Sequence, residues 1–328
     1  MMERLLDVKN LSTSFFTLNG EVKAVNDVSF HVNKGEIIAV VGESGCGKSV
    51  TQMSVMRLIQ SPPGKILSGE VWFDGKDLRK LTEKEMRKVR GHEISMIFQE
   101  PMTSLNPVYT IGNQVSEVIR THLGCGKKEA WEKGIQALKS VDIPEPEMRM
   151  NNYPFELSGG MRQRVLIAIA VACNSKLIIA DEPTTALDVT TQAQVMDLLL
   201  KIVKEYQKSM IVVTHNLGLV TRYAERIYVM YAGKIIESGS TRDILTNPQH
   251  PYTKGLMESV PNLYGSKDVD LIPIDGAPPS LARLPSGCSF EPRCKFRNEG
   301  CKSCQPSLHL VGDREHYSAC VLNAEESK

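Results

Sequence analysis

The sequence predicts an α/β fold with a parallel sheet, and two patterns support this prediction. Short, continuous apolar runs at Leu177–Ala180 and Met210–Thr214 suit parallel strands that are buried on both faces. A helical pattern from about Val189 to Gln207 separates them, which gives a strand–helix–strand unit. A third strand, Ile37–Val41, leads through a glycine-rich loop into a helix from about Ser49 to Leu58.

The remaining segments predict two additions to this core. Strand-like stretches such as Leu5–Val8 and Val28–Val32, with a hairpin signal at Asp74-Gly75, predict an antiparallel β segment on the N-terminal side. A helical subdomain is expected at about residues 100–160. A shift to prolines and cysteines then predicts a domain of residues 1–255 followed by a small, loop-rich, cysteine-rich C-terminal domain of residues 256–328.

Composition narrows the class of protein. Apolar residues make up 41% and charged residues 23%, which is ordinary for a soluble globular chain. The formal net charge of +1 is too small for the whole protein to attract nucleic acid electrostatically, so no nucleic-acid partner is expected. The longest apolar run, Val165–Cys173, is too short to cross a bilayer, and the N-terminus lacks a secretory signal. We therefore expect a cytosolic chain whose membrane role acts through partner chains.

The glycine-rich loop Gly42–Ser49 fits the phosphate-binding pattern G-x-x-x-x-G-K-[ST] in full. Its glycines let backbone N–H groups wrap phosphates, Lys48 places a positive charge against the β and γ phosphates, and the Ser49 hydroxyl can ligate Mg²⁺. The helix that follows points its positive end at the same anion. The expected ATP-binding residues of this loop are Gly42, Glu43, Ser44, Gly45, Cys46, Gly47, Lys48, Ser49 and Val50.

Two carboxylates at the end of a strand predict the residues that bind Mg²⁺ and activate water. Asp181 and Glu182 follow Leu177–Ala180, and we assign Asp181 to the Mg²⁺ shell and Glu182 to the general base that activates water. His215 and Gln99 each follow a strand, at the edge where ligands bind in parallel sheets. We expect His215 to hold the water and base in place, and Gln99 to sense Mg²⁺ and the attacking water.

The segment Leu157–Arg164, which reads Leu-Ser-Gly-Gly-Met-Arg-Gln-Arg, resembles the signature motif of ABC-type ATPases. The phosphate loop, Gln99, the signature, Asp181-Glu182, the Ala186-Leu187-Asp188 turn and His215 follow one another in the order of that family. The resemblance covers about residues 3–260 and implies a P-loop NTPase core of the ABC type. Soluble ABC ATPases without a membrane partner, and P-loop kinases, are the weaker alternatives.

The family resemblance implies that two such domains pair head to tail around ATP. Ser158 and Gly160 would then contact the ATP of the partner, and Asp188 would contact across the dimer. Phe15 occupies the position that stacks on adenine in this family, with Phe16 as the alternative.

Two segments resemble the ATPase subunits of oligopeptide and dipeptide importers and their nickel-type relatives: Gln99–Pro107 and Asn247–Lys254. This implies peptide import, with nickel or another small solute as the alternative. The implied partners are a second ABC ATPase in a heterodimer, two transmembrane permease subunits and an extracellular substrate-binding protein. The implied location is the cytoplasmic face of the membrane, as a peripheral subunit.

Five of the eight cysteines lie in the C-terminal tail. In a cytosolic chain such a cluster indicates metal before disulfide. The tail resembles that of the same subfamily, which implies a 4Fe–4S cluster, with zinc as the alternative. The expected ligands are Cys288, Cys294, Cys301 and Cys320, with Cys304 as the alternative to Cys301.

Overall fold

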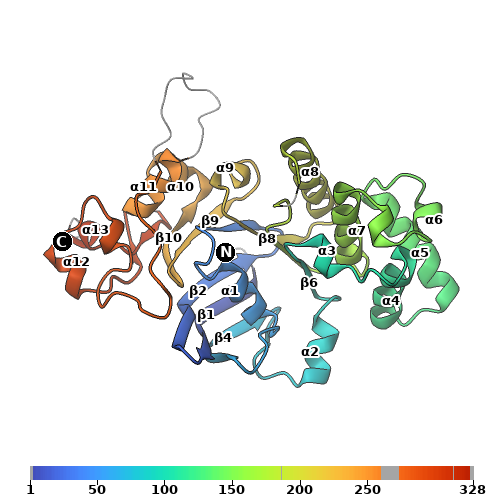
Figure 1. The fold of residues 1–328 in the computed structure, drawn as a ribbon, viewed down its shortest axis with the longest axis horizontal. Helices are drawn as coiled ribbons and strands as arrows, with labels where there is room; N and C mark the ends of the chain where they lie inside the picture. The colour runs from blue at the N-terminus through green and yellow to red at the C-terminus, as the bar shows by residue number, and fades with distance from the viewer. Residues whose placement is uncertain (1–2, 186, 260–272, 313, 326–328) are drawn as a thin grey trace. The chain divides into compact units, whose positions relative to one another are not determined.

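The computed structural model describes residues 3–185, 187–259, 273–312 and 314–325. The chain divides into two compact units, and Figure 1 labels their elements. Unit 1 consists of Met1–Asn33, Ile37–Arg79 and Val212–Lys328, and unit 2 consists of Lys34–Glu36 and Lys80–Ile211. The predicted domain boundary at residues 255/256 stays a prediction, and residues 260–272 beside it lie outside the described part of the chain.

An antiparallel sheet with the strand order β2-β1-β4-β5 forms the N-terminal part of unit 1. Its strands are β1 (Arg4–Thr17), β2 (Gly20–Asn33), β4 (Gly64–Phe73) and β5 (Lys76–Asp77). The predicted segments were shorter than strands β1 and β2. Register shifts between Val8 and Phe15 interrupt the two-residue alternation by which a strand is recognised in a sequence. Asp74 and Gly75 both have positive φ in the tight turn between β4 and β5, as the hairpin signal predicts.

A second set of strands in unit 1 has the order β11-β12-β10-β9-β3. These strands are β3 (Ile37–Val41), β9 (Arg226–Tyr231), β10 (Lys234–Ser240), β11 (His309–Leu310) and β12 (Tyr317–Ser318). Strand β3 pairs in parallel with β9, and all of its residues are buried. The other neighbours pair antiparallel. The prediction of a buried parallel strand before the phosphate loop is therefore confirmed.

The helices of unit 1 are short. They are α1 (Lys48–Val55), α9 (Leu217–Val220), α10 (Thr241–Thr246), α11 (Pro251–Glu258), the 3₁₀ helix η2 (Glu291–Arg293), α12 (Glu299–Ser303) and α13 (Val321–Glu325). Helix α11 begins at Pro251, whose missing N–H costs nothing at a first helical position. The imidazole of His250 caps this helix by accepting from the backbone N–H of Tyr252 at 3.0 Å.

Unit 2 contains the helical stretch and the parallel strand pair β6 (Ile94–Ile97) and β7 (Leu177–Asp181). Strand β8 (Ser209–Thr214) contains the boundary between the two units. The helices of unit 2 are α2 (Glu83–Val89), α3 (Pro101–Ser104), α4 (Ile111–Leu123), α5 (Lys127–Ser140), α6 (Pro146–Arg149), the 3₁₀ helix η1 (Pro154–Glu156), α7 (Gly159–Val171) and α8 (Val189–Glu205). Among the residues described, no helix combines the length and apolarity that a bilayer crossing requires.

Helices α4, α5 and α7 pack against one another in unit 2. Ile119, Ala130 and Leu138 are buried there, as their apolar spacing predicts. Leu123, by contrast, is 39% exposed. It is the last residue of α4, and the chain leaves the helix through Gly124 in a left-handed conformation.

A buried carboxylate joins the C-terminal region to the strands of unit 1. Glu237 on β10 has no exposed surface and accepts from the backbone N–H groups of Gln249 and His250, at 2.7 and 2.8 Å. Its Oε1 also lies 2.7 Å from Nε2 of His316. These contacts hold the start of α11 and the segment before β12 against one strand. Since a buried carboxylate without partners is costly, they fix this part of unit 1.

The buried His250 should make unit 1 sensitive to acid. Burial lowers the pKa of His250 to about 4, whereas an unfolded chain has a histidine pKa of about 6.5. The unfolded state therefore takes up a proton that the folded state does not. The stability that the neutral ring provides is complete above pH 6.5 and is lost as the pH falls toward 4. We expect the free energy of unfolding to fall by about 2 kcal/mol between pH 7 and pH 5 from this group.

Urea unfolding of a Trp131→Phe variant would measure this, because Trp72 then remains as the only tryptophan and reports on unit 1. The matched control is His250→Asn, whose amide oxygen can keep the cap to Tyr252 N–H. The acid sensitivity should shrink in this variant. An unchanged pH dependence would contradict the assignment.

Candidate active site

The phosphate loop Gly42–Ser49 lies in unit 1 between β3 and α1. Two of its glycines have no room for a side chain. A Cβ on Gly42 would lie 2.1 Å from the carbonyl oxygen of Met230, and a Cβ on Gly47 would lie 2.1 Å from that of Ala24. Both glycines also have positive φ, at 155° and 105°. The backbone of the loop is therefore held directly against the backbone of β9 and β2.

Lys48 is 4% exposed and its ammonium bonds to the loop itself. Nζ donates to the carbonyl oxygens of Gly42 at 2.7 Å and Glu43 at 2.9 Å. Helix α1 begins at Lys48, so its N-terminal N–H groups and dipole favour an anion at this loop. Burial raises the pKa of the Cys46 thiol, which disfavours a role as a nucleophile.

Glu43 has two partners that the sequence did not reveal. Its backbone N–H donates to the hydroxyl of Tyr252 at 2.9 Å. Its carboxylate forms a two-pronged ion pair with Arg293, with Nη1–Oε2 at 2.7 Å and Nη2–Oε1 at 3.0 Å. This pairing raises the pKa of Arg293 above its ordinary range. A single arginine 250 positions away gives no pattern from which such a contact could be predicted.

The carboxylate pair Asp181-Glu182 ends strand β7 in unit 2, and both residues are buried. Glu182 has a φ of 45°, a conformation that non-glycine residues adopt at a cost and that clusters at functional sites. Oε2 of Glu182 accepts from Nε2 of Gln99 at 3.1 Å and from the hydroxyl of Thr185 at 2.8 Å. The structure thus brings Gln99 and Glu182 together, and it adds Thr185 as a residue that the sequence did not indicate.

The signature segment forms the start of α7 in unit 2. Ser158 caps the helix by accepting from the backbone N–H of Met161 at 3.3 Å, and its side chain is exposed. Leu157 is buried and anchors the segment. A Cβ on Gly160 would lie 3.0 Å from the Thr191 methyl group, so a small residue suits this position. The exposed helix start offers N–H groups and a positive dipole end to an external anion.

Family models and curated relatives both match this chain. Residues 25–185 match the model described as "ABC transporter", and residues 236–301 match "Oligopeptide/dipeptide transporter, C-terminal region". A putative peptide import ATP-binding protein of Brucella melitensis biotype 1 is 50% identical over 327 residues, which cover 97% of this chain and 96% of the relative. The oligopeptide transport ATP-binding protein OppD of Bacillus subtilis is 48% identical, and the match covers 99% of this chain and 91% of that relative. The dipeptide transport ATP-binding protein DppD of the same organism is 48% identical, and the match covers 100% of this chain and 97% of that relative.

The chain belongs to the ABC transporter ATP-binding proteins, in the oligopeptide/dipeptide family. The resemblance inferred from the signature and the order of motifs is confirmed. Its core also resembles solved ABC cassettes. A dimer of the ATP-binding cassette MJ0796 in a post-hydrolysis state with ADP and Pi has a TM-score of 0.65 at 30% identity, covering 72% of this chain and 99% of that one. The predicted α/β ABC fold and ATPase activity are therefore established for this ABC ATPase.

Three other predicted contacts of the ABC ATPase remain predictions. His215 follows β8 and is exposed, and Phe15 is half-buried on β1, whereas Phe16 is 52% exposed. Asp188 caps α8 by accepting from the backbone N–H of Thr191, which lowers the pKa of its carboxyl. Ala186, in the turn before it, lies outside the described residues.

The tail cysteines of the ABC ATPase gather in unit 1 as free thiols. Burial raises the pKa values of Cys288 and Cys294, and the nearby Cys301 and Cys320 add to this effect. The backbone N–H of Cys288 also donates to the carbonyl oxygen of Cys301 at 2.8 Å. Cys301 is buried, whereas Cys304 is exposed, so the structure favours Cys301 over Cys304 as the member of this group.

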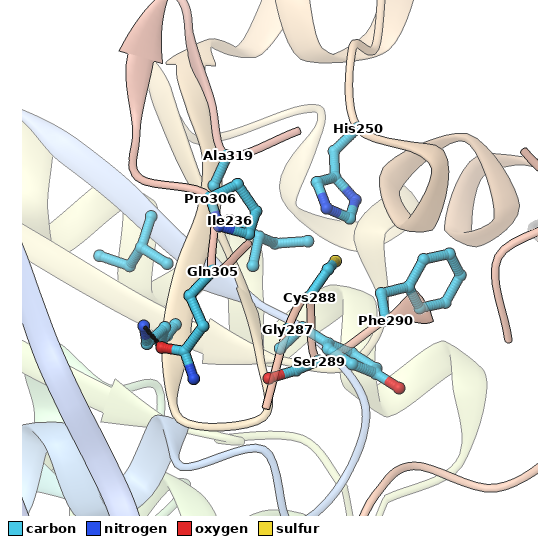
Figure 2. Close-up of a pocket in the computed structure, with 12 residues that line it drawn as sticks. Ile236, His250, Gly287, Cys288, Ser289, Phe290, Gln305, Pro306 and Ala319 are labelled. Atoms are coloured by element: carbon cyan, nitrogen blue, oxygen red, sulfur yellow. Dashed lines mark hydrogen bonds between the residues drawn. The ribbon is translucent and has the colours of Figure 1, made fainter. Parts of the chain in front are cut away.

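The prediction of a metal site in this tail is not supported. Within the described ranges, no group of three or more His, Cys, Asp or Glu side chains is arranged to hold a metal ion. Burial raises the pKa of Cys288 to about 11. Figure 2 shows Cys288 and His250 at a cavity of about 30 Å³, which Ile236, Phe290 and Pro306 also line. This volume suits a water molecule.

Alkylation rates should follow the burial of the thiols. At pH 8 a thiol with a pKa of about 11 holds roughly a hundredfold less thiolate than one with the ordinary value of 9.0. We therefore expect a short iodoacetamide pulse to label exposed Cys304 before Cys173 and Cys288, as measured by peptide mass spectrometry. The same pulse in urea is the control, and all eight cysteines should then react. Labelling of Cys288 before Cys304 would contradict this account.

Proposed function

We propose that this ABC ATPase hydrolyses ATP to drive the import of dipeptides and oligopeptides through partner membrane chains. The observation that carries the proposal is the match of the whole chain, including residues 236–301, to proteins named for peptide import. The test is uptake of a labelled tripeptide into proteoliposomes that contain the ATPases, the permeases and the binding protein. Uptake should require ATP. Nickel uptake without peptide uptake would favour the alternative substrate.

The proposed chemistry is the attack of water on the γ-phosphate of ATP, which yields ADP and phosphate. Lys48 would neutralise the β and γ phosphates, and Ser49, Gln99 and Asp181 would hold the Mg²⁺ ion, which would stabilise the charge on the phosphates. Glu182 takes the proton from the attacking water. The bonds from Gln99 and Thr185 support this role, because they hold the Glu182 carboxylate in one orientation. His215 helps to place the water, and Phe15 stacks on the adenine.

Two ATPase domains pair head to tail in this proposal. Ser158 and Gly160 contact the γ-phosphate of the ATP that the partner domain binds, and Asp188 contacts the partner. The exposed start of α7 at Ser158 supports this, as does the dimeric state of the similar cassette MJ0796. The second domain belongs to a different ATPase subunit. Two permease subunits and an extracellular substrate-binding protein complete the complex, with this chain on the cytoplasmic face of the membrane.

The tail is proposed to bind a 4Fe–4S cluster through Cys288, Cys294, Cys301 and Cys320, with zinc as the alternative. The ground for this proposal is the match of residues 236–301 to the oligopeptide/dipeptide transporter C-terminal region, since the described thiols as they stand are not arranged to hold a metal ion. Each thiol must lose its proton to become a ligand, so metal binding would oppose the effect of burial, which raises the pKa values of Cys288, Cys294 and Cys320. The cluster has no step in ATP hydrolysis.

The Glu182→Gln variant should bind MgATP normally and lose at least about a hundredfold in kcat, because the water loses its base. Phosphate release and equilibrium nucleotide binding measure the two effects. The matched control is Lys48→Ala, which should lose nucleotide binding itself. Hydrolysis by Glu182→Gln at the parent rate would contradict the assignment of the base.

Metal analysis tests the tail directly. Protein purified without oxygen should contain iron with matching sulfide and absorb visible light. A Cys301→Ser variant should lose the iron, whereas Cys304→Ser should retain it. Zinc in place of iron would select the alternative, and protein without metal would refute the proposal while leaving the ATPase assignment unchanged.

A further inference from the structure

The phosphate loop carries a negative charge of its own. Glu43 is its second residue, and its side chain is 27% exposed. ATP brings several negative charges to the same loop. A carboxylate beside them would repel the phosphates, because like charges at short range disfavour each other in a partly buried site. Binding of ATP therefore favours a loop in which the Glu43 charge is neutralised.

Arg293 supplies the opposite charge from the C-terminal region. It ends the 3₁₀ helix η2, and its side chain is only 5% exposed. Its two terminal nitrogens each donate to a different carboxylate oxygen of Glu43, at 2.7 and 3.0 Å. This fork-to-fork geometry is specific to arginine, since lysine offers a single ammonium.

Contacts other than that with Glu43 also fix the orientation of the Arg293 guanidinium. Nε donates to the carbonyl oxygen of Asp275 at 2.9 Å, and Nη2 donates to that of Ile274 at 3.3 Å. Nη1 lies 3.4 Å from the hydroxyl of Tyr231, and the guanidinium carbon lies 5.9 and 6.0 Å from the ring centroids of Tyr231 and Phe290. A charge fixed in this way loses little conformational freedom when it pairs.

The backbone of Glu43 is held from two further directions. Its N–H donates to the hydroxyl of Tyr252, and its carbonyl oxygen accepts from Lys48, each at 2.9 Å. Tyr252 packs against Tyr231 and Phe290, the same rings that flank Arg293. One residue of the loop thus connects the phosphate-binding lysine to the region after residue 250.

We propose that Arg293 is a positioning residue of the ATP site, which neutralises Glu43 so that the phosphate loop accepts a triphosphate. The C-terminal region then forms part of the nucleotide-binding apparatus. This inference rests on the proposed role of the loop as the ATP site. It concerns the affinity for nucleotide and leaves the chemical step to Glu182.

Steady-state ATPase kinetics of three variants, Arg293→Met, Glu43→Gln and Glu43→Gln/Arg293→Met, test the proposal. Arg293→Met exposes the loop to an unpaired carboxylate and should raise KM for MgATP about tenfold, with kcat changed less than about twofold. The rise should be smaller at high salt. Glu43→Gln alone leaves the Arg293 charge unpaired beside the phosphates and should lower KM. The double variant should return KM to within about twofold of the parent, because the charge that needed neutralising is gone.

A structural role for Arg293 predicts a different pattern. The double variant would then bind ATP as poorly as Arg293→Met, and that result would overturn the proposal, as would an unchanged KM in Arg293→Met. If Arg293→Met does not fold, the comparison of Glu43→Gln with the parent and of Arg293→Lys with the parent replaces it. Arg293→Lys should raise KM by an intermediate factor, and a parental KM would count against the proposal. Retained ATP binding in Lys48→Ala would instead refute the loop as the ATP site.

Discussion

The close approach of the phosphate loop to two neighbouring backbones is the constraint on which the site depends. Gly42 lies against the carbonyl of Met230 at the end of β9, and Gly47 lies against that of Ala24 in β2. The backbone N–H of Gly233, after β9, also donates to the carbonyl oxygen of Cys46 at 2.9 Å. The loop is thus fixed from outside before any ligand arrives. Such preorganisation lowers the entropy cost of binding phosphates.

The region after residue 236 takes part in the same constraint. Glu237 fixes the start of α11, and the first turn of α11 carries Tyr252, whose hydroxyl accepts from the Glu43 backbone. Arg293 then pairs with the Glu43 side chain. The segment that matches the oligopeptide/dipeptide transporter C-terminal region therefore reaches the phosphate loop by buried, directional contacts. Within unit 1, these contacts connect it to the phosphate loop.

The sequence predicted what depends on local pattern. The phosphate loop and the strands β3 and β7 each need only a few consecutive residue types. It did not predict what depends on distant contacts. The full extent of β1 was hidden by its register shifts, and the Arg293–Glu43 pair joins residues 250 positions apart. The left-handed conformation of Glu182 is likewise set by its surroundings, because glutamate has no intrinsic preference for it. The resemblance of the tail to its subfamily singled out four thiols, which the described part of the structure does not arrange to hold a metal ion.

Nucleotide binding by two alanine variants of the loop tests the central constraint most directly. Gly47→Ala places a Cβ against the Ala24 carbonyl, whereas Gly45→Ala, also at positive φ, meets no atom within 4 Å. The account predicts that Gly47→Ala loses at least about tenfold in MgATP affinity in a calorimetric titration, because the loop must move to relieve the clash. Gly45→Ala should lose much less, since it bears only the backbone strain. Equal losses in the two variants, or parental affinity in Gly47→Ala, would contradict the claim that close backbone contact builds the site.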